Sequence, residues 1–212
     1  MNKVSQTSVF SPLLRKIPTR KRRDTRRTPL FEGDEALFID ILNQTRVYGE
    51  YGCGASTIWV ARNTGCAIRG VDTSRVWIDT VAAACTDRAD IDLHHSDLGD
   101  LGDWGRPVSY SKARDFPDYT DWLWRSGARP DTVLIDGRFR VCCFMTSVLN
   151  ADPGTRLILD DYTNRPWYHI VEDILPVART CGRQALFQVP GPGAIDRARA
   201  TDLVEKFRYV FD

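Results

Sequence analysis

Short apolar runs alternate with helix-like stretches from Pro29 onward, and this alternation constrains the fold more than any other feature of the sequence. Such alternation is typical of strand-helix units and a parallel sheet. Right-handed crossovers between the strands then give an α/β, doubly wound, Rossmann-like sheet. The expected strands are 46–51, 67–71, 91–95, 132–136 and 156–160, and the expected helices run from Glu32 or Asp34 to about Asn43 and over 56–63, 74–86, 139–150 and 166–180.

The end of the chain predicts a reversal of strand direction. Residues 183–189 form an apolar run, a Pro-Gly turn follows at 190–193, and apolar residues recur at every second position in 203–211. Two strands joined by so short a link are expected to be antiparallel neighbours. They would complete a mostly parallel seven-stranded sheet with an antiparallel C-terminal strand.

Composition limits the organisation of the chain to one domain and an appendage. The chain has 212 residues, of which 42% are hydrophobic, enough to bury one sizeable core. We find no apolar run of the length that a membrane span requires, and we expect no secretory signal. Its six cysteines lack zinc-type spacing and are interpreted as reduced core residues. These features favour a cytoplasmic protein, and a homo-oligomer remains open.

The first 28 residues carry a strong positive charge. Nine Lys or Arg accompany a single acid, Asp24, which leaves 20 basic and 27 acidic residues in the rest of the chain. Such a segment has too little apolar surface to fold, so we expect a disordered arm over 1–28 and a single domain over 29–212. The arm could bind nucleic acid or an acidic membrane surface, could be an organellar transit segment, or could be a solvated tail without a partner.

A glycine-rich loop follows the first predicted strand, in the segment Glu50-Tyr51-Gly52-Cys53-Gly54-Ala55-Ser56-Thr57. Glycines at such a place allow a tight turn and a close approach of a ligand to the backbone. An acid, Asp72, ends the second predicted strand, where a carboxylate can accept hydrogen bonds from ribose hydroxyls. Together these features indicate a site for an adenosine-containing ligand.

These residues resemble the first motif of class I S-adenosylmethionine-dependent methyltransferases, in which an acid precedes Gly-x-Gly-x-Gly. Ser56 stands at the place of the third glycine. The resemblance implies that Gly52 and Gly54 lie under the methionine part of the cofactor, that Glu50 orders its amino group, and that Asp72 holds the ribose. Asp97, which follows the third predicted strand, would lie near the adenine amino group, although an Asp in a loop also commonly forms a local turn.

Acidic residues also close the fourth and fifth predicted strands, and parallel strand ends meet at one edge of the sheet. Asp136 and Asp161 resemble metal-binding positions of catechol-type O-methyltransferases, but Tyr162 replaces an Asn there, so no divalent metal is expected. Without a metal, Asp136 or Asp161 could act as general base, and Arg138 or Arg140 could orient an anionic acceptor. His169 is a further candidate base; each of these residues could instead be structural.

The segment 104–124 holds six of the 22 aromatic residues of the chain. It would be a lid over the acceptor, an interface, or a helix near 119–125 that packs its rings on the sheet.

The leading hypothesis is S-adenosylmethionine-dependent methyl transfer to an unidentified oxygen or nitrogen acceptor, most simply a small molecule. The alternatives are a catalytically inactive module that binds an adenosyl ligand, an NAD-type oxidoreductase, and an enzyme that modifies nucleic acid with the arm as its anchor. The loop lacks the third glycine that dinucleotide binding requires at the position of Thr57.

Overall fold

The computed structural model describes residues 30–31, 34–125 and 127–212. The predicted arm over 1–28 lies outside the described residues, and so does Glu32, one of the two predicted starts of the first helix. The proposed boundary between arm and domain therefore stays a prediction.

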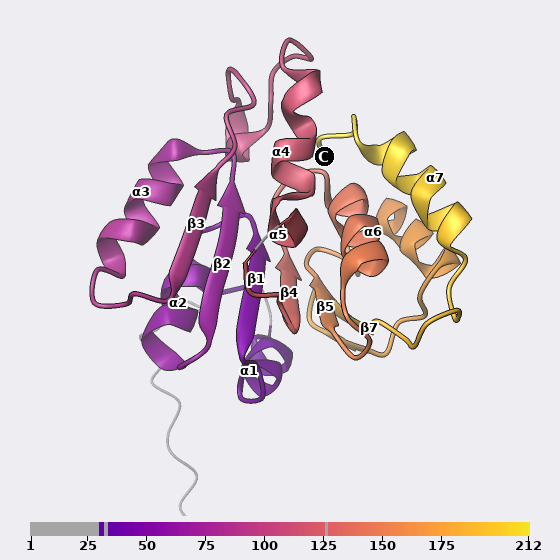
Figure 1. Cartoon of the computed structure of the whole chain (residues 1–212), viewed down its shortest axis with the longest axis horizontal. Coiled ribbons are helices and arrows are strands. Elements are labelled where there is room, and N and C mark those ends of the chain that lie inside the picture. The colour runs from indigo at the N-terminus through magenta and orange to yellow at the C-terminus, as the bar shows by residue number, and fades with distance from the viewer. Residues whose placement is uncertain (1–29, 32–33, 126) are drawn as a thin grey trace, which may run out of the picture.

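Seven strands form a single mixed sheet in the order β3-β2-β1-β4-β5-β7-β6 (Figure 1). Strands β1 to β5 pair in parallel, and β7 is antiparallel to both β5 and β6. This confirms the doubly wound, Rossmann-like α/β sheet with a reversed strand near the end of the chain. The strands are β1 Val47–Tyr51, β2 Ala67–Asp72, β3 Ile91–His95, β4 Thr132–Ile135, β5 Arg156–Leu159, β6 Arg179–Cys181 and β7 Gln184–Gln188.

Helices connect most of the parallel strands, and several begin at a residue that the sequence marks. The Ser74 hydroxyl accepts a hydrogen bond from the Trp77 amide at the start of α3, which is the contact expected of an N-cap. The α-helices are α1 Ala36–Leu42, α2 Ala55–Asn63, α3 Arg75–Ala84, α4 Phe116–Thr120, α5 Trp122–Arg125, α6 Arg140–Asn150 and α7 Arg197–Phe207, and the 3-10 helices are η1 Asp103–Gly105, η2 Ala113–Asp115 and η3 Pro166–Asp173.

The prediction of a strand over 203–211 is wrong, because most of this range belongs to the helix α7. The Asp196 carboxylate caps the helix by accepting from the Arg199 amide at 2.9 Å. Ala200, Leu203 and Val204 are buried, a spacing that fits one face of a helix as well as alternation fits a strand. The segment is therefore a helix that packs against α6, although its apolar residues also fit the alternation of a strand.

The predicted helix over 166–180 is wrong in its length and in part of its type. The 3-10 helix η3 ends at Asp173, and the chain returns as the three-residue strand β6. Pro176 lies between them and cannot donate the backbone hydrogen bond that a continued helix needs. The strand that pairs with β7 thus comes before it in the sequence rather than after it.

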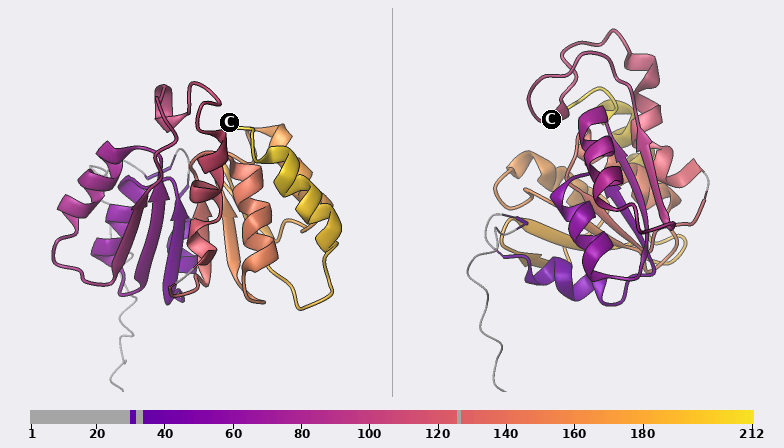
Figure 2. Two further views of the ribbon diagram at one scale, coloured as in Figure 1. Left: turned by 45° about the horizontal axis from the view of Figure 1, so that its top comes forward. Right: turned by 90° about the vertical axis from the view of Figure 1, so that its left-hand side faces the viewer.

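Two hydrophobic cores cover the two faces of the sheet, as the alternation along β1 shows. Tyr48 packs with α1, α2 and α3, whereas Tyr51 packs with α4, α5, α6 and α7. Both rings are fully buried. The views in Figure 2 show helices on both sides of the sheet. Among the described residues, no helix has the length and apolar character to span a membrane.

Candidate functional site

The glycine loop follows β1 and turns sharply at Gly52. This residue has a φ of +94°, and a Cβ atom there would lie 2.6 Å from the Cα of Gly137, which follows β4. Only glycine combines that left-handed conformation with so close an approach of two backbones. Gly54 differs, because a Cβ built on it meets no described atom within 4 Å. The space beside Gly54 is therefore open.

Glu50 is fully buried and holds the loop to the start of α2. Its carboxylate accepts hydrogen bonds from the Ser56 hydroxyl and, at 2.6 Å, from the Thr57 hydroxyl. The Thr57 oxygen in turn accepts from the Gly54 amide at 2.8 Å. Burial raises the pKa of Glu50 to about 7. The structure thus brings Glu50, Gly54 and Ser56 into one hydrogen-bonded group.

Asp72 lies directly against the same loop. Its Oδ2 accepts from the Cys53 amide at 2.8 Å, and its Oδ1 accepts from the Ser74 amide at 2.6 Å. Only 8% of the residue is exposed, and this burial raises its pKa to about 6. A carboxylate oxygen can accept more than one hydrogen bond, so Asp72 can still accept a ligand hydroxyl. The acid and the glycine loop therefore meet at one point of the sheet edge.

Asp97 is placed differently from the other candidate cofactor residues. Its side chain is exposed, one oxygen pairs with the Lys112 ammonium, and the other accepts from the Gly99 amide at 3.1 Å. The hydrogen bond from Lys112 lowers the pKa of Asp97. The bond to Gly99 is the local turn that an Asp in a loop commonly forms. The structure does not join Asp97 by a hydrogen bond to the described part of the glycine loop.

Three carboxyl groups gather where β4 and β5 end. They belong to Asp136, Asp160 and Asp161, and one oxygen of each lies within 4.8 Å of the others. The exposed fraction of the Asp136 side chain is 26%, but its carboxyl lies among buried neighbours. This burial and the nearby charge of Asp160 hold the pKa of Asp136 well above its ordinary value. The predicted pair Asp136 and Asp161 is therefore brought together.

Arginine side chains neutralise these carboxylates. Arg140, which is 3% exposed, pairs with Asp136 and Asp161 at 3.1 Å each. Arg165 reaches Asp161 at 2.9 Å, and Arg183 reaches Asp160 at 2.7 Å. Charge-assisted contacts of this kind keep the acids in place although they are largely removed from water.

The same contacts make the acidic cluster a poor site for a divalent cation. Carboxylate oxygens that Mg²⁺ would need already accept from guanidinium groups, which would repel the ion. The Tyr162 hydroxyl donates to Glu172, outside the cluster. The donor set does not fit a hard metal ion.

His169 lies in the exposed part of η3 and is engaged elsewhere. Its Nε2 lies 3.2 Å from the Tyr162 carbonyl oxygen, and its ring lies 4.5 Å from the Tyr162 ring, centroid to centroid. The structure shows no hydrogen bond from His169 to Asp136 or Asp161 within the described part of the chain. Its predicted role as a base has therefore no geometric support here.

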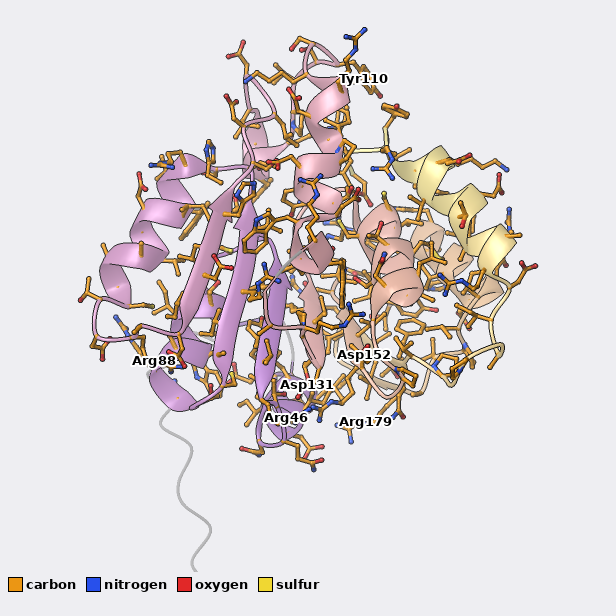
Figure 3. All side chains as sticks on the ribbon, in the orientation of Figure 1. Arg46, Arg88, Tyr110, Asp131, Asp152 and Arg179 are labelled. Carbon is orange, nitrogen blue, oxygen red and sulfur yellow. The ribbon has the colours of Figure 1, made fainter. Side chains whose placement is uncertain are left out.

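A groove of about 440 Å³ opens beside Arg138, which follows β4. Tyr110 reaches this end of the sheet, whereas Arg46, Asp131 and Asp152 lie at the opposite end (Figure 3). No sequence motif marks Arg106 or Asp212 as groove residues, because both lie far from β4 along the chain. The groove is lined by Gly102, Asp103, Trp104, Arg106, Pro107, Val108, Arg138, Phe211 and Asp212.

Backbone strain is concentrated at this edge. Among the described residues, the non-glycine residues with positive φ are Trp104, Phe139 and Asp161, and all three follow the carboxyl ends of strands. Such conformations cost about 1–3 kcal/mol each and persist where the surrounding structure imposes them.

Several solved structures are similar to this chain. A methyltransferase-like protein from Silicibacter pomeroyi is 33% identical, with a TM-score of 0.74, over 85% of this chain and 97% of that one. An RNA methyltransferase from Salinibacter ruber, solved with S-adenosylhomocysteine, is 12% identical, with a TM-score of 0.47, over 76% of this chain and 94% of that one. An O-methyltransferase family protein from Burkholderia thailandensis is 15% identical, with a TM-score of 0.47, over 75% and 57% of the two chains. No protein-family model and no curated protein matches the chain.

The first of these relatives is similar over almost its whole length, and the reversed β7 agrees with the antiparallel strand expected from the end of the sequence. The other two are too distant to carry an acceptor over to this protein. The chain therefore belongs to the methyltransferase-like proteins of the class I, S-adenosylmethionine-dependent methyltransferase family.

Proposed function

We propose that the protein transfers a methyl group from S-adenosylmethionine to an oxygen or nitrogen atom of a small acceptor, at the carboxyl edge of the sheet. The observation that carries this proposal is the contact between Asp72 and the Cys53 amide, because it puts the ribose-type acid and the glycine loop at one point. The open space beside Gly54 leaves room for a ligand there.

In this proposal Asp72 accepts hydrogen bonds from the ribose, and Gly52 and Gly54 line the methionine part of the cofactor. Glu50 acts through Ser56 and Thr57, because its buried carboxylate holds the start of α2. The amides at that helix start carry partial positive charge and suit the cofactor carboxylate. Asp97 remains a candidate for the adenine side, with its bond to Lys112 as the competing interaction.

The bound cofactor supplies a methyl sulfonium. The acceptor atom forms a bond to the methyl carbon while the bond from carbon to sulfur breaks, and the acceptor proton leaves to a base. Asp136 suits the base because its pKa is raised and part of its side chain is exposed. Asp161 instead positions Arg140, since guanidinium groups already surround it. Orientation of the two reactants supplies the larger share of the rate.

A binding experiment tests the cofactor site directly. Asp72→Asn should weaken S-adenosylhomocysteine binding by about 1–3 kcal/mol, because the amide replaces a charged acceptor. Isothermal titration calorimetry measures the change, and the thermal melting temperature reports whether the variant is folded. The matched control is Asp79→Asn, which alters an exposed acid on α3.

Unchanged affinity in a folded Asp72→Asn protein would contradict the proposed ribose site. The inactive-module alternative gives a different result, namely cofactor binding of the expected strength with no turnover on any acceptor. The oxidoreductase alternative predicts that reduced dinucleotide, and not S-adenosylhomocysteine, raises the melting temperature.

A further inference from the structure

The groove beside Arg138 contains an anionic group of the protein itself. The Asp212 carboxylate accepts from the Arg140 amide at 3.2 Å, at the first residue of α6. The Asp212 carbonyl accepts from the Arg138 guanidinium. Asp212 also contributes to raising the pKa of Tyr168 to about 12, after the larger effect of burial. Asp212 is thus bound where a helix start and a guanidinium group favour negative charge.

The Arg138 side chain retains hydrogen-bonding capacity at this place. Its Nε is buried and has no hydrogen-bond partner among the described residues. Buried donors in proteins are normally satisfied, so an unpaired guanidinium N–H beside a groove points to a ligand. A planar carboxylate can accept from two N–H groups of one guanidinium, which a single backbone carbonyl cannot do.

The remaining lining of the groove combines the charged side chains of Asp103 and Arg106 with apolar and aromatic ones. Trp104 is 89% exposed, an unusual exposure for so large a ring, and Val108 is 60% exposed. Phe211 forms another wall, and the Arg106 guanidinium lies 5.6 Å from the centre of its ring. Arg106 and Arg138 therefore place two positive charges beside apolar surface.

The segment 209–212 is held by aromatic contacts in addition to the hydrogen bonds of Asp212. The Phe211 ring lies 4.8 Å from the Tyr110 ring, centroid to centroid, and the Tyr110 hydroxyl donates to the Tyr209 carbonyl at 3.0 Å. Tyr209 and Val210 are themselves 49% and 43% exposed. A segment with so much exposed surface can be displaced at modest cost.

The groove is also adjacent to the proposed cofactor site. Arg138 directly follows Gly137, whose backbone meets Gly52 closely enough to exclude any Cβ there. The positive charge of Arg138 is near enough to Asp72 to help lower the pKa of that carboxyl against the larger effect of burial. A molecule in the groove therefore lies beside the end of β1.

We propose that the groove binds the methyl acceptor through a carboxylate group next to an apolar or aromatic body. Asp212, with its backbone oxygen on Arg138 and its carboxylate on the Arg140 amide, occupies that place until the acceptor displaces it. That the ligand is a methyl acceptor rests on the proposed function. That the groove binds a carboxylate rests only on the residues that line it. Asp212 is in this way an internal competitor of a carboxylate-bearing acceptor.

Benzoate and benzamide serve as probes, since they share a ring and differ in charge. Each is titrated calorimetrically into the full chain, with and without S-adenosylhomocysteine. Asp212→Asn should tighten benzoate binding about tenfold, because it removes the competing charge, and should leave benzamide unchanged. The matched control Asp202→Asn removes an exposed carboxylate on α7 and should leave both probes unchanged.

Arg138→Gln should weaken benzoate binding about tenfold or more in a protein whose melting temperature shows that it is folded. The proposal is overturned if Asp212→Asn leaves the ratio of benzoate to benzamide affinity unchanged, or if folded Arg138→Gln binds benzoate as the unmodified protein does. Failure of S-adenosylhomocysteine to bind would contradict the proposed function only, because the benzoate titrations without it still report on the groove.

Discussion

The two halves of the carboxyl edge are built from different kinds of contact. At the ends of β1 and β2, the acids Glu50 and Asp72 are satisfied by hydroxyls and amides within 19 positions along the chain. At the ends of β4 and β5, the Arg140 guanidinium joins Asp136 four positions away and Asp161 21 positions away, and the Asp212 carboxylate reaches the Arg140 backbone amide from 72 positions away. The ends of β1 and β2, here called the cofactor half, are thus held by contacts between residues close in sequence. The ends of β4 and β5, here called the acceptor half, also depend on tertiary packing.

The largest effect is expected from Arg140, which holds the acceptor half together. Arg140→Met would remove the guanidinium that the buried Asp161 shares with the half-buried Asp136, and breaking a buried ion pair in this way costs about 3–5 kcal/mol. Urea unfolding measures the change. The control Arg179→Ala removes a surface pair with Asp40 and should cost under about 1 kcal/mol. Equal losses of unfolding free energy in the two variants would contradict the expectation that the buried Arg140 stabilises the protein more than the surface Arg179.

The cofactor half should instead give stability a pH dependence through Glu50. Its pKa rises from 4.5 unfolded to about 7 folded, so the folded state binds the proton more tightly and stability falls as pH increases from 4.5 through 7. A shift of this size corresponds to a loss of about 3 kcal/mol. Urea unfolding at pH 5 and pH 8 measures it. Glu50→Gln should reduce this dependence but not abolish it, because Asp72, whose pKa is raised to about 6, contributes in the same direction. An equally steep dependence in that variant would assign it to other acids.

Gly52 and Gly54 allow a comparison within the loop. Gly52→Ala should destabilise the protein by about 2–3 kcal/mol, since the residue has positive φ and its Cβ would contact Gly137. Gly54→Ala has no such contact, so its folding stability should change by less than about 1 kcal/mol while S-adenosylhomocysteine binding weakens. Thermal unfolding and calorimetry separate the two effects. If Gly54→Ala bound S-adenosylhomocysteine as tightly as the unmodified protein, the cofactor could not lie in the open space beside Gly54.

The smallest effect on stability is expected at Trp104. Because its ring is 89% exposed, Trp104→Ala should change the unfolding free energy by no more than about 0.5 kcal/mol. Phe116→Ala, in the buried part of the same aromatic segment, should cost about 3–5 kcal/mol. A large loss of stability in Trp104→Ala would show that this ring supports the fold rather than facing a ligand.

The aromatic segment 104–124 was only partly predictable from the sequence. The predicted packing of rings near 119–125 matches the buried Tyr119 and the partly buried Trp122 and Trp124, whereas Trp104 and Tyr110 are exposed as a lid or interface would be. The two alternatives each describe one part of the segment. Composition could not divide it, because burial of an aromatic ring depends on which helix lies opposite.

The local pattern of the chain was sufficient for the parallel strands, the glycine loop and Asp72, because strand alternation and turn chemistry are encoded within a few neighbouring residues. Tertiary structure alone decided that 197–207 is a helix, that β6 precedes β7, and that Asp212 bonds to both Arg138 and Arg140. The physical reason is range: hydrogen bonds near in sequence leave a motif, whereas charge pairs between distant segments form only once packing has brought their side chains together.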